Sequence, residues 1–228
     1  GELAESYQIF PGGRIVFKVR QGIHYGLNPA SEASRLVAGR ELTAYDIEYS
    51  LKRLVTTPGS YHITSTAGLA DNVKINALDK WTLDITTTPD FFYVAVYMLG
   101  FQAFGDRPRE VIAKYGDMTS WKNAVGTGAF LLTDVVQASS ATYVKNPNYW
   151  EKDPVGPGKG QQLPYVDKSI ILIIPDNSTQ QAALRTGKVD YLSGLAYEDA
   201  KGLTKTTPQL LQAKDMTQGG QGVFMRTD

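Results

Sequence analysis

The sequence predicts a fold in which short β-strands are mixed with short helices. Two segments, residues 14–20 and 81–87, carry apolar residues at every second position, as strands do when one face is buried. A third segment, which begins at Thr43, carries apolar residues at helical spacing. Turns rich in glycine, proline and asparagine separate these segments, so each element is expected to be short.

Composition and charge narrow the classes of protein to be considered. The chain has 228 residues, 42% apolar and 11% aromatic, enough for one large domain or two small ones with a hydrophobic core. Lysine plus arginine and aspartate plus glutamate number 23 each, so the formal net charge is zero. A nucleic-acid binder normally has a basic excess, and so does a protein that attaches to membranes by charge. Both classes are therefore disfavoured.

The residue types give little support to metal or cofactor chemistry. The chain has no cysteine, which excludes disulfides, thiolate metal sites and cysteine nucleophiles. Its two histidines, His24 and His62, lie in unrelated segments and form no metal-binding motif such as HExxH. We therefore expect no metal and no organic cofactor.

Neither a membrane span nor a leader is recognisable. The longest apolar run, residues 170–174, is only as long as a strand, whereas a membrane helix needs roughly 20 residues. The chain opens on Gly1 without a signal-peptide pattern. We expect it to be a piece of a longer protein, with no direct membrane insertion by this segment.

The N-terminal part is predicted to place a capped helix beside strands. Residues 7–10 have a weak strand pattern, and residues 26–38 are expected to form a loop. Thr43 is a suitable N-cap, and Asp46 in the first turn complements the helix dipole. The helix is expected to end before Pro58.

The next part is predicted to contain two paired strands and two helices. The strands cover residues 73–75 and 81–87. A helix over residues 89–99 is apolar almost all round, so we expect it to be buried. A further short helix is predicted over residues 108–115, with proline near its first turn.

A glycine-rich motif opens the middle of the chain. Gly126 and Gly128 flank Thr127, and glycine tolerates a positive φ or the close approach of another segment. Strand patterns at residues 130–136 and 141–145 follow, joined by a short polar connection that suits a hairpin.

The hairpin is predicted to end at an Asn-Pro-Asn turn, residues 146–148, followed by Tyr149 and Trp150. Trp150 is expected to be buried where this motif meets the sheet. Residues 151–164 are rich in glycine and proline and are expected to form a surface loop.

The remaining elements are predicted from shorter patterns. Residues 169–174 are predicted to form a strand covered on both faces, because every residue after Ser169 is apolar. Asp176 can cap a helix that runs to residue 185, and residues 189–191 are expected to return as a strand. The last predictions are a helix at 197–203 and strands at 210–213 and 223–225.

The order and spacing of these motifs resemble one family. GTGAF at 126–130 leads through the hairpin to NPNYW at 146–150, and IPDNSTQQAALRTGKVDYL at 174–192 reads as strand, helix and strand. The family is that of the extracellular solute-binding proteins of the dipeptide/oligopeptide type (family 5), which feed ABC importers. Further positions that match its pattern are Arg20, Gly22, Tyr25, Gly39, Thr43, Ala44 and Asp46. Residues 26–38 look like an insertion, and Tyr45 stands where an acidic residue is usual.

The resemblance implies an α+β fragment of a type II (cluster C) periplasmic binding protein-like fold, with mixed β-sheets and short helices. Residues 1–122 would be part of the small subdomain of the first lobe, and residues 123–228 part of that lobe's central sheet. The second lobe would be absent. The implied function is capture of a small solute, foremost a peptide, in the periplasm or at the cell surface, and delivery to a membrane permease without catalysis.

Candidate site residues come from two segments. In the family, the loop after the helix at Thr43 can reach the ligand, which makes Tyr61 and His62 candidate ligand contacts. Tyrosine offers a flat apolar face and one hydrogen bond, which suits a peptide or a sugar. Gly126, Thr127 and Gly128 are candidate hinge residues, where a strand leaves one subdomain and enters another.

Alternative functions remain open at this point. The same fold could bind an oligosaccharide, a nickel chelate or haem. A hydrolase is a rival from another class, since a Ser-His-Asp triad is set by geometry, although the chain has no GxSxG motif. A surface adhesion module is a third. The GxG at 126–128 completes no phosphate-binding motif.

Overall fold

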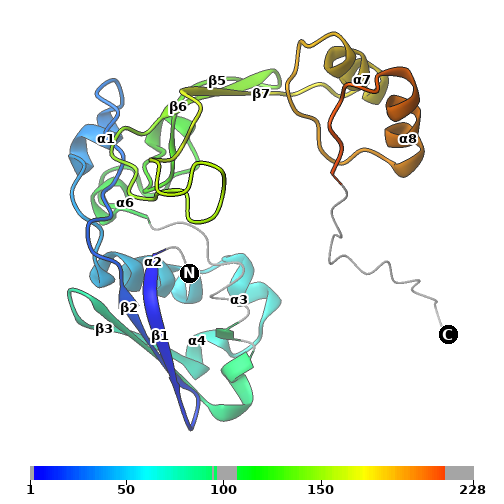
Figure 1. The fold of residues 1–228 in the computed structure, drawn as a ribbon. Helices are drawn as coiled ribbons and strands as arrows, with labels where there is room; N and C mark the ends of the chain where they lie inside the picture. The colour runs from blue at the N-terminus through cyan, green and yellow to red at the C-terminus, as the bar shows by residue number, and fades with distance from the viewer. Residues whose placement is uncertain (1–2, 94, 97–106, 214–228) are drawn as a thin grey trace, which may run out of the picture. The chain divides into compact units, whose positions relative to one another are not determined.

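The computed structural model of the chain describes residues 3–93, 95–96 and 107–213. The chain divides into two compact units, Gly1–Leu172 and Ile173–Asp228. Figure 1 shows the course of the chain through both units. In the described part of the chain, no helix combines the length and the apolar character that a bilayer crossing requires.

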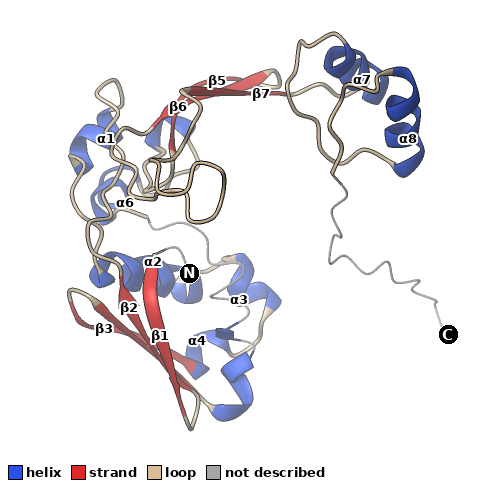
Figure 2. Cartoon of the chain, in the orientation of Figure 1, coloured by secondary structure: helices blue, strands red, loops and turns tan. Residues whose placement is uncertain are grey.

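The first unit begins with a four-stranded antiparallel sheet (Figure 2). Its strand order is β1-β2-β4-β3. The strands are β1 (Ala4–Phe10), β2 (Arg14–Val19), β3 (Val73–Asp79) and β4 (Thr82–Thr87). The register places Ile15 and Ile75 on either side of Ile85, so the alternating apolar residues share one face. The predicted strands are confirmed, and β1 and β3 are longer than predicted.

Helix α2 (Ala44–Thr56) covers the apolar face of this sheet, packing on β3 and β4. Leu51 and Val55 of the helix belong to the same buried cluster as Ile75 and Ile85. The predicted N-cap is confirmed: Thr43 and Asp46 form a capping box, in which the Thr43 N–H donates to Asp46 Oδ2 at 2.9 Å. Short helices α3 (Tyr61–Ser65) and α4 (Leu69–Asn72) follow.

The helix predicted over residues 89–99 is only partly within the described residues. Pro89–Phe91 form the 3-10 helix η1, and residues 92–93 and 95–96 are helical. Ala95 is buried, but Tyr93 is 83% exposed. The expectation that this helix is buried all round is therefore wrong at Tyr93, because an apolar sequence does not by itself supply a packing partner.

Residues 26–38 do not form a simple loop. Their second half is helix α1 (Glu32–Val37), because Ser31 accepts a hydrogen bond from the Ser34 N–H as a true N-cap. Ala33 and Val37 join a second buried cluster. Its other buried members are Ile23, Tyr25, Leu42, Val111 and Val125. Helix α6 (Arg109–Tyr115) was predicted and is confirmed; η2 (Trp121–Asn123) is a further 3-10 turn.

A three-stranded antiparallel sheet with the order β5-β6-β7 completes the first unit. Its strands are β5 (Phe130–Val136), β6 (Ser140–Lys145) and β7 (Lys168–Leu172). The predicted hairpin is confirmed. The expectation that the strand at 169–174 is covered on both faces is wrong: Ile170 and Ile171 are 50% and 55% exposed. Among the described strands, β7 pairs with β6 alone and lies at the edge of the sheet, so no described element covers its apolar side chains.

The second unit contains α7 (Asn177–Arg185) and α8 (Tyr197–Thr206). Asp176 caps α7 as predicted, since its Oδ1 accepts from the Thr179 N–H at 2.7 Å. No residue of α7 is buried. The strands predicted at 189–191 and 210–213 are wrong, because neither segment pairs with another strand. The strand predicted at 223–225 lies outside the described residues.

Candidate ligand-binding cleft

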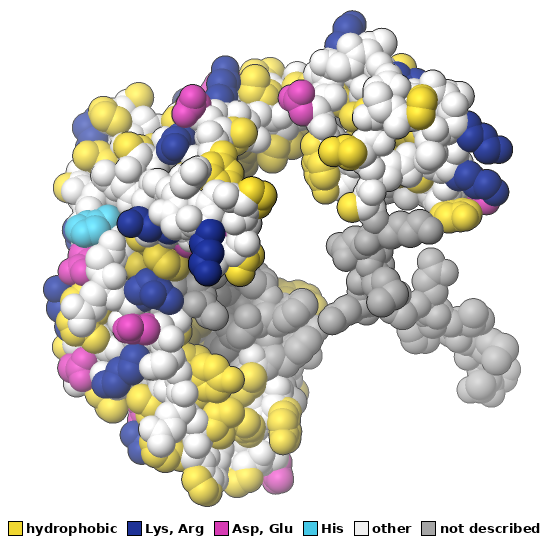
Figure 3. All heavy atoms as spheres, viewed as in Figure 1, with side chains coloured by type: hydrophobic (Ala, Val, Ile, Leu, Met, Phe, Trp, Pro, Cys, Tyr) yellow, Lys and Arg dark blue, Asp and Glu magenta, His cyan; other side chains and the backbone are white. Residues whose placement is uncertain are grey.

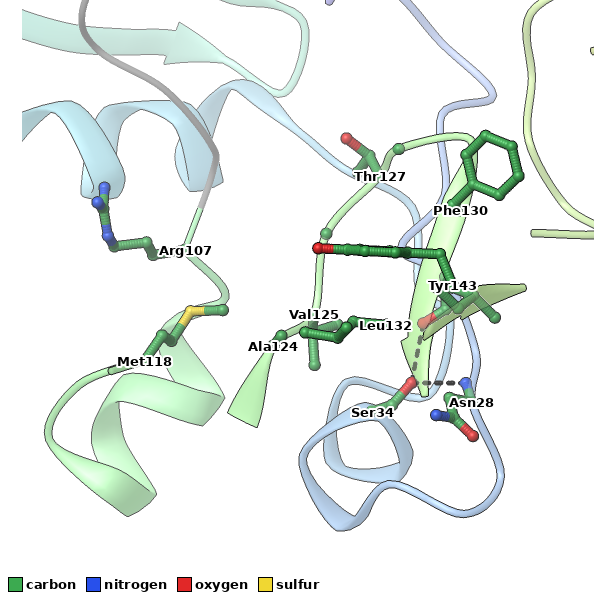
Figure 4. A pocket seen from close by; sticks show the side chains of 14 residues that line it. Asn28, Ser34, Arg107, Met118, Ala124, Val125, Thr127, Phe130, Leu132 and Tyr143 are labelled. Carbon is green, nitrogen blue, oxygen red and sulfur yellow. Dashed lines mark hydrogen bonds between the residues drawn. The ribbon is translucent and has the colours of Figure 1, made fainter. Parts of the chain in front are cut away.

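The first unit contains a cleft of about 530 Å³ beside the glycine-rich motif (Figure 4). This volume lies within the range of small-molecule sites, about 300–1,000 Å³. Most of the wall is apolar or backbone. The lining residues are Gly26, Asn28, Ser34, Arg107, Met118, Ala124, Val125, Gly126, Thr127, Gly128, Phe130, Leu131, Leu132 and Tyr143.

The glycine-rich motif forms one wall by running beside the segment that contains Gly26. The Gly26 N–H donates to the Gly126 carbonyl at 2.9 Å. Neither Gly126 nor Gly128 has a positive φ, and a Cβ added to either would meet no atom within 4 Å. A Cβ at Gly26, in contrast, would collide with Leu131 Cδ2. The motif therefore does approach another segment closely, but the glycine at which an added Cβ would collide with a neighbour is Gly26.

Asn146 fixes the motif to the end of the hairpin. The Asn146 side chain is 1% exposed, and its Nδ2 donates to the Gly128 carbonyl at 2.9 Å. Its backbone N–H donates to the Ala129 carbonyl at 2.9 Å, and its Oδ1 accepts from the Asn148 N–H at 3.1 Å. Sequence reasoning read the Asn-Pro-Asn run as a turn and missed this link. Trp150, expected to be buried, is only partly buried and lies under the Arg20 guanidinium.

Segment 26–38 forms a further part of the wall and is held by its own hydrogen bonds. Ser34 Oγ donates to the Gly26 carbonyl at 2.9 Å and accepts from the Asn28 N–H at 2.8 Å (Figure 4). An ion pair joins Glu32 of α1 to Lys114 of α6. Segment 26–38 is thus a fixed wall of the cleft.

The polar groups of the cleft are mostly uncharged. The Tyr143 ring extends from β6 across the cleft, with its hydroxyl toward the side where Met118 and Arg107 lie (Figure 4). Thr127 is 9% exposed. Arg107 is the one charged residue in the described lining, and its backbone N–H donates to Ser50 Oγ at 2.7 Å. No carboxylate lines the cleft among the described residues.

An ion-pair network lies in the same unit, between α2 and α6. Arg40 donates to Glu110 Oε1 at 2.6 Å and to Asp46 Oδ1 at 2.8 Å. The hydrogen bond from Arg40 lowers the pKa of Glu110, and the two carboxylates raise the pKa of Arg40, Glu110 most of all. Burial alone would raise the pKa of Asp46, but the hydrogen bonds from Arg40 and Thr43 lower it below its usual value.

The predicted site residues are only partly brought together. Gly126, Thr127 and Gly128 line the cleft. Tyr61 and His62 begin α3 instead. Tyr61 is not among the described lining residues, and its side chain is 65% exposed; the His62 side chain lies outside what the structure describes. Their role as ligand contacts stays a prediction. The described residues contain no group of three or more His, Cys, Asp or Glu side chains that could hold a metal ion.

The visible surface of the first unit mixes charges of both signs. Figure 3 shows Lys and Arg side chains among Asp and Glu side chains on this face, without a single-sign stripe. A nucleic-acid interface would need such a stripe.

Comparison with known proteins shows the same fold and family. The family model described as "Bacterial extracellular solute-binding proteins, family 5 Middle" matches residues 1–228. Heme-binding protein A of Haemophilus influenzae is 26% identical, over 94% of this chain and 39% of its own length. Glutathione-binding protein GsiB of Escherichia coli is 28% identical, over 89% of this chain and 35% of its own length.

Solved structures give the fold. AgaA from A. tumefacien, in complex with agropinic acid, has a TM-score of 0.68 and 26% identity, over 90% of this chain and 37% of its own. Haemophilus influenzae OppA, in complex with the peptide RPPGFSPFR, has a TM-score of 0.66 and 23% identity, over 90% of this chain and 39% of its own. The likeness to OppA is evidence for the fold alone.

These results define the class first: the fold is that of type II periplasmic binding proteins. The chain belongs to the bacterial extracellular solute-binding proteins of family 5. It spans 39% of the length of the haem-binding relative and 35% of the glutathione-binding one.

Proposed function

We propose that this chain is part of the substrate-binding component of an ABC-type importer, which captures a small solute outside the membrane and delivers it to a permease. The observation that carries this proposal is the family match over residues 1–228. The named relatives bind dipeptides, oligopeptides, glutathione or haem. A peptide is the ligand that most of these names share, so we propose a peptide.

The proposed mechanism is enclosure between two lobes. Small-molecule sites bury most of the ligand surface, which needs walls on both sides. We assign residues 1–122 to the small subdomain of the first lobe and residues 123–228 to its central sheet. The cleft beside Gly126–Thr127–Gly128 lies where these two parts meet, which supports a hinge role for the motif. The second wall would come from the rest of the protein.

Tyr61 and His62 are proposed ligand contacts on the first lobe. The Tyr61 side chain is 65% exposed, so it is accessible to a ligand that the second lobe would enclose from the other side. The proposed location is the periplasm or the cell surface, and no reaction is catalysed: the named relatives are binding proteins.

Calorimetry with a library of di- to pentapeptides tests the proposal. Because association itself costs several kcal/mol, a single wall rarely gives measurable affinity. The whole protein is expected to bind its peptide with a dissociation constant on the order of micromolar or tighter, and the 228-residue chain about millimolar or weaker. Tight binding by the chain alone would contradict the two-lobed mechanism.

Two further observations separate the rival functions. Genes for permeases and ATPases beside the parent gene would support import, and their absence would favour an adhesion module. Haem as the ligand would show as an absorption band on titration, whereas hydrolysis of the peptides during calorimetry would indicate an enzyme.

A further inference from the structure

One side chain of the cleft, Tyr143, is supplied by the middle strand of a sheet. Tyr143 lies on β6, the central strand of its sheet, opposite Leu132 of β5 and Ser169 of β7. Pairing on both sides fixes the backbone from which the ring extends, and a specific binding site needs such a rigid support. Within the described part of the chain, the Tyr143 hydroxyl makes no hydrogen bond, although it extends into the cleft (Figure 4).

A second part of the lining is equally well defined. Asn28 and Ser34 come from segment 26–38. Both side chains are tied back to this segment: Ser34 Oγ donates to the Gly26 carbonyl at 2.9 Å, and Asn28 Oδ1 accepts from the Ala30 N–H at 3.1 Å. This part of the lining is therefore held in place by hydrogen bonds within the segment.

The residues that line the cleft favour some peptide side chains over others. Met118, Val125 and Leu132 offer apolar contact. Among the described lining residues the one charge is that of Arg107, which is positive, and none is negative. A cationic side chain would lose its hydration there without gaining a counter-charge, which is costly. An apolar side chain would be buried favourably, in proportion to its area.

We propose that this cleft is a specificity pocket that prefers an apolar to a cationic side chain of the captured peptide, with the Tyr143 hydroxyl donating to a main-chain carbonyl of that peptide. The proposal rests on the proposed function, capture of a peptide. It adds the class of side chain preferred and names Tyr143 and segment 26–38 as determinants of specificity.

The test measures dissociation constants of the whole protein for three matched tripeptides: Ala-Phe-Ala, Ala-Lys-Ala and Ala-Glu-Ala. Wild type is expected to prefer the phenylalanine peptide to the lysine peptide. Tyr143→Phe removes only the hydroxyl and should weaken binding of all three by about five- to tenfold, because the main-chain carbonyl is common to them.

Asn28→Asp supplies the missing negative charge. Aspartate keeps the oxygen that accepts from the Ala30 N–H, so the wall is expected to stay folded. The variant should improve binding of the lysine peptide relative to the phenylalanine peptide by about tenfold. Asn148→Asp is the matched control: Asn148 is exposed and does not line the cleft, so the preference should not move.

The outcomes distinguish this inference from the function on which it rests. Peptide binding that neither Tyr143→Phe nor Asn28→Asp alters would overturn the specificity pocket and leave peptide capture standing. A preference shift in the Asn148→Asp control would also overturn it. Failure of the whole protein to bind any peptide would overturn both.

Discussion

The two sheets of the first unit are built from similar apolar strands, yet only one of them has a buried core. In the sheet β1-β2-β4-β3, Ile75 and Ile85 are 2% and 4% exposed beneath α2. In the sheet β5-β6-β7, no strand residue is buried, and Ile171 is 55% exposed. It follows that a run of β-branched residues is enough to specify a strand. Burial of that strand also needs a second element, such as a helix, that packs on its apolar face.

The second sheet is held instead by backbone pairing and polar links. Asn146 connects the end of β6 to the glycine-rich motif before β5, through bonds to the Gly128 and Ala129 carbonyls. We therefore expect apolar truncations to matter most in the first sheet and polar truncations in the second.

The largest expected effect is that of Ile85→Ala. It leaves a cavity between Ile15 and Ile75 and should lower the free energy of unfolding by about 2–5 kcal/mol. Ile171→Ala is the matched change on β7 and should cost less than about 1 kcal/mol. Denaturant unfolding followed by tryptophan fluorescence reports on this unit, because Trp81, Trp121 and Trp150 all lie in it. Equal losses would show that β7 is covered in the folded protein.

Asn146→Ala should come next, with a loss of about 1–3 kcal/mol, because it removes a buried side chain and leaves the Gly128 carbonyl without this donor. The control is Asn148→Ala, at an exposed position of the same motif, with an expected change within about 0.5 kcal/mol. Urea titrations of both variants measure the difference. If the two substitutions cost the same, Asn146 is a turn residue and not a link.

Gly26→Ala tests the packing between the segment at Gly26 and strand β5. The new methyl group would press on Leu131, which can move in part, so a loss of about 1–3 kcal/mol is expected. Gly126→Ala, across the hydrogen bond from Gly26, should change stability by less than about 0.5 kcal/mol, since its Cβ would enter open space. Thermal melts of the two variants measure the two losses of stability. A larger loss for Gly126→Ala than for Gly26→Ala would show that Gly26 is not the sterically restricted position.

The smallest expected effect is a pH dependence of the first unit. The pKa values of Asp46 and Glu110 are lowered in the folded chain. Their contribution to stability is therefore complete above the unfolded values, about 3.9 and 4.3, and is lost as the pH falls through the lower folded values. Unfolding measured by tryptophan fluorescence between about pH 5 and pH 2 should show this loss.

Asp46→Asn should flatten that acid dependence, and Thr43→Ala should cost about 1 kcal/mol through the same cap. Asp176→Asn serves as the control. Its pKa is also lowered, but it is an exposed cap in the other compact unit. An acid slope in Asp46→Asn equal to that of the wild type would mean that the network around Arg40 does not stabilise the fold.

Much of this protein follows from patterns that are local in the sequence. The strands at β2 and β4 follow from their period of two, and the start of α2 follows from Thr43 and Asp46. The family follows from the order of GTGAF and NPNYW. Each of these signals depends on residues within a few positions of one another, where backbone preference and side-chain capping act directly.

Only the tertiary structure decided which of these residues meet. The tight glycine is Gly26 rather than Gly126, and Tyr143 lines the cleft whereas Tyr61 does not. The exposure of β7 was likewise invisible in its apolar sequence. The physical reason is common to all three. Steric fit, burial and the lining of a cleft depend on atoms from segments that are distant in the sequence, and a local pattern does not indicate which distant segment will pack against it.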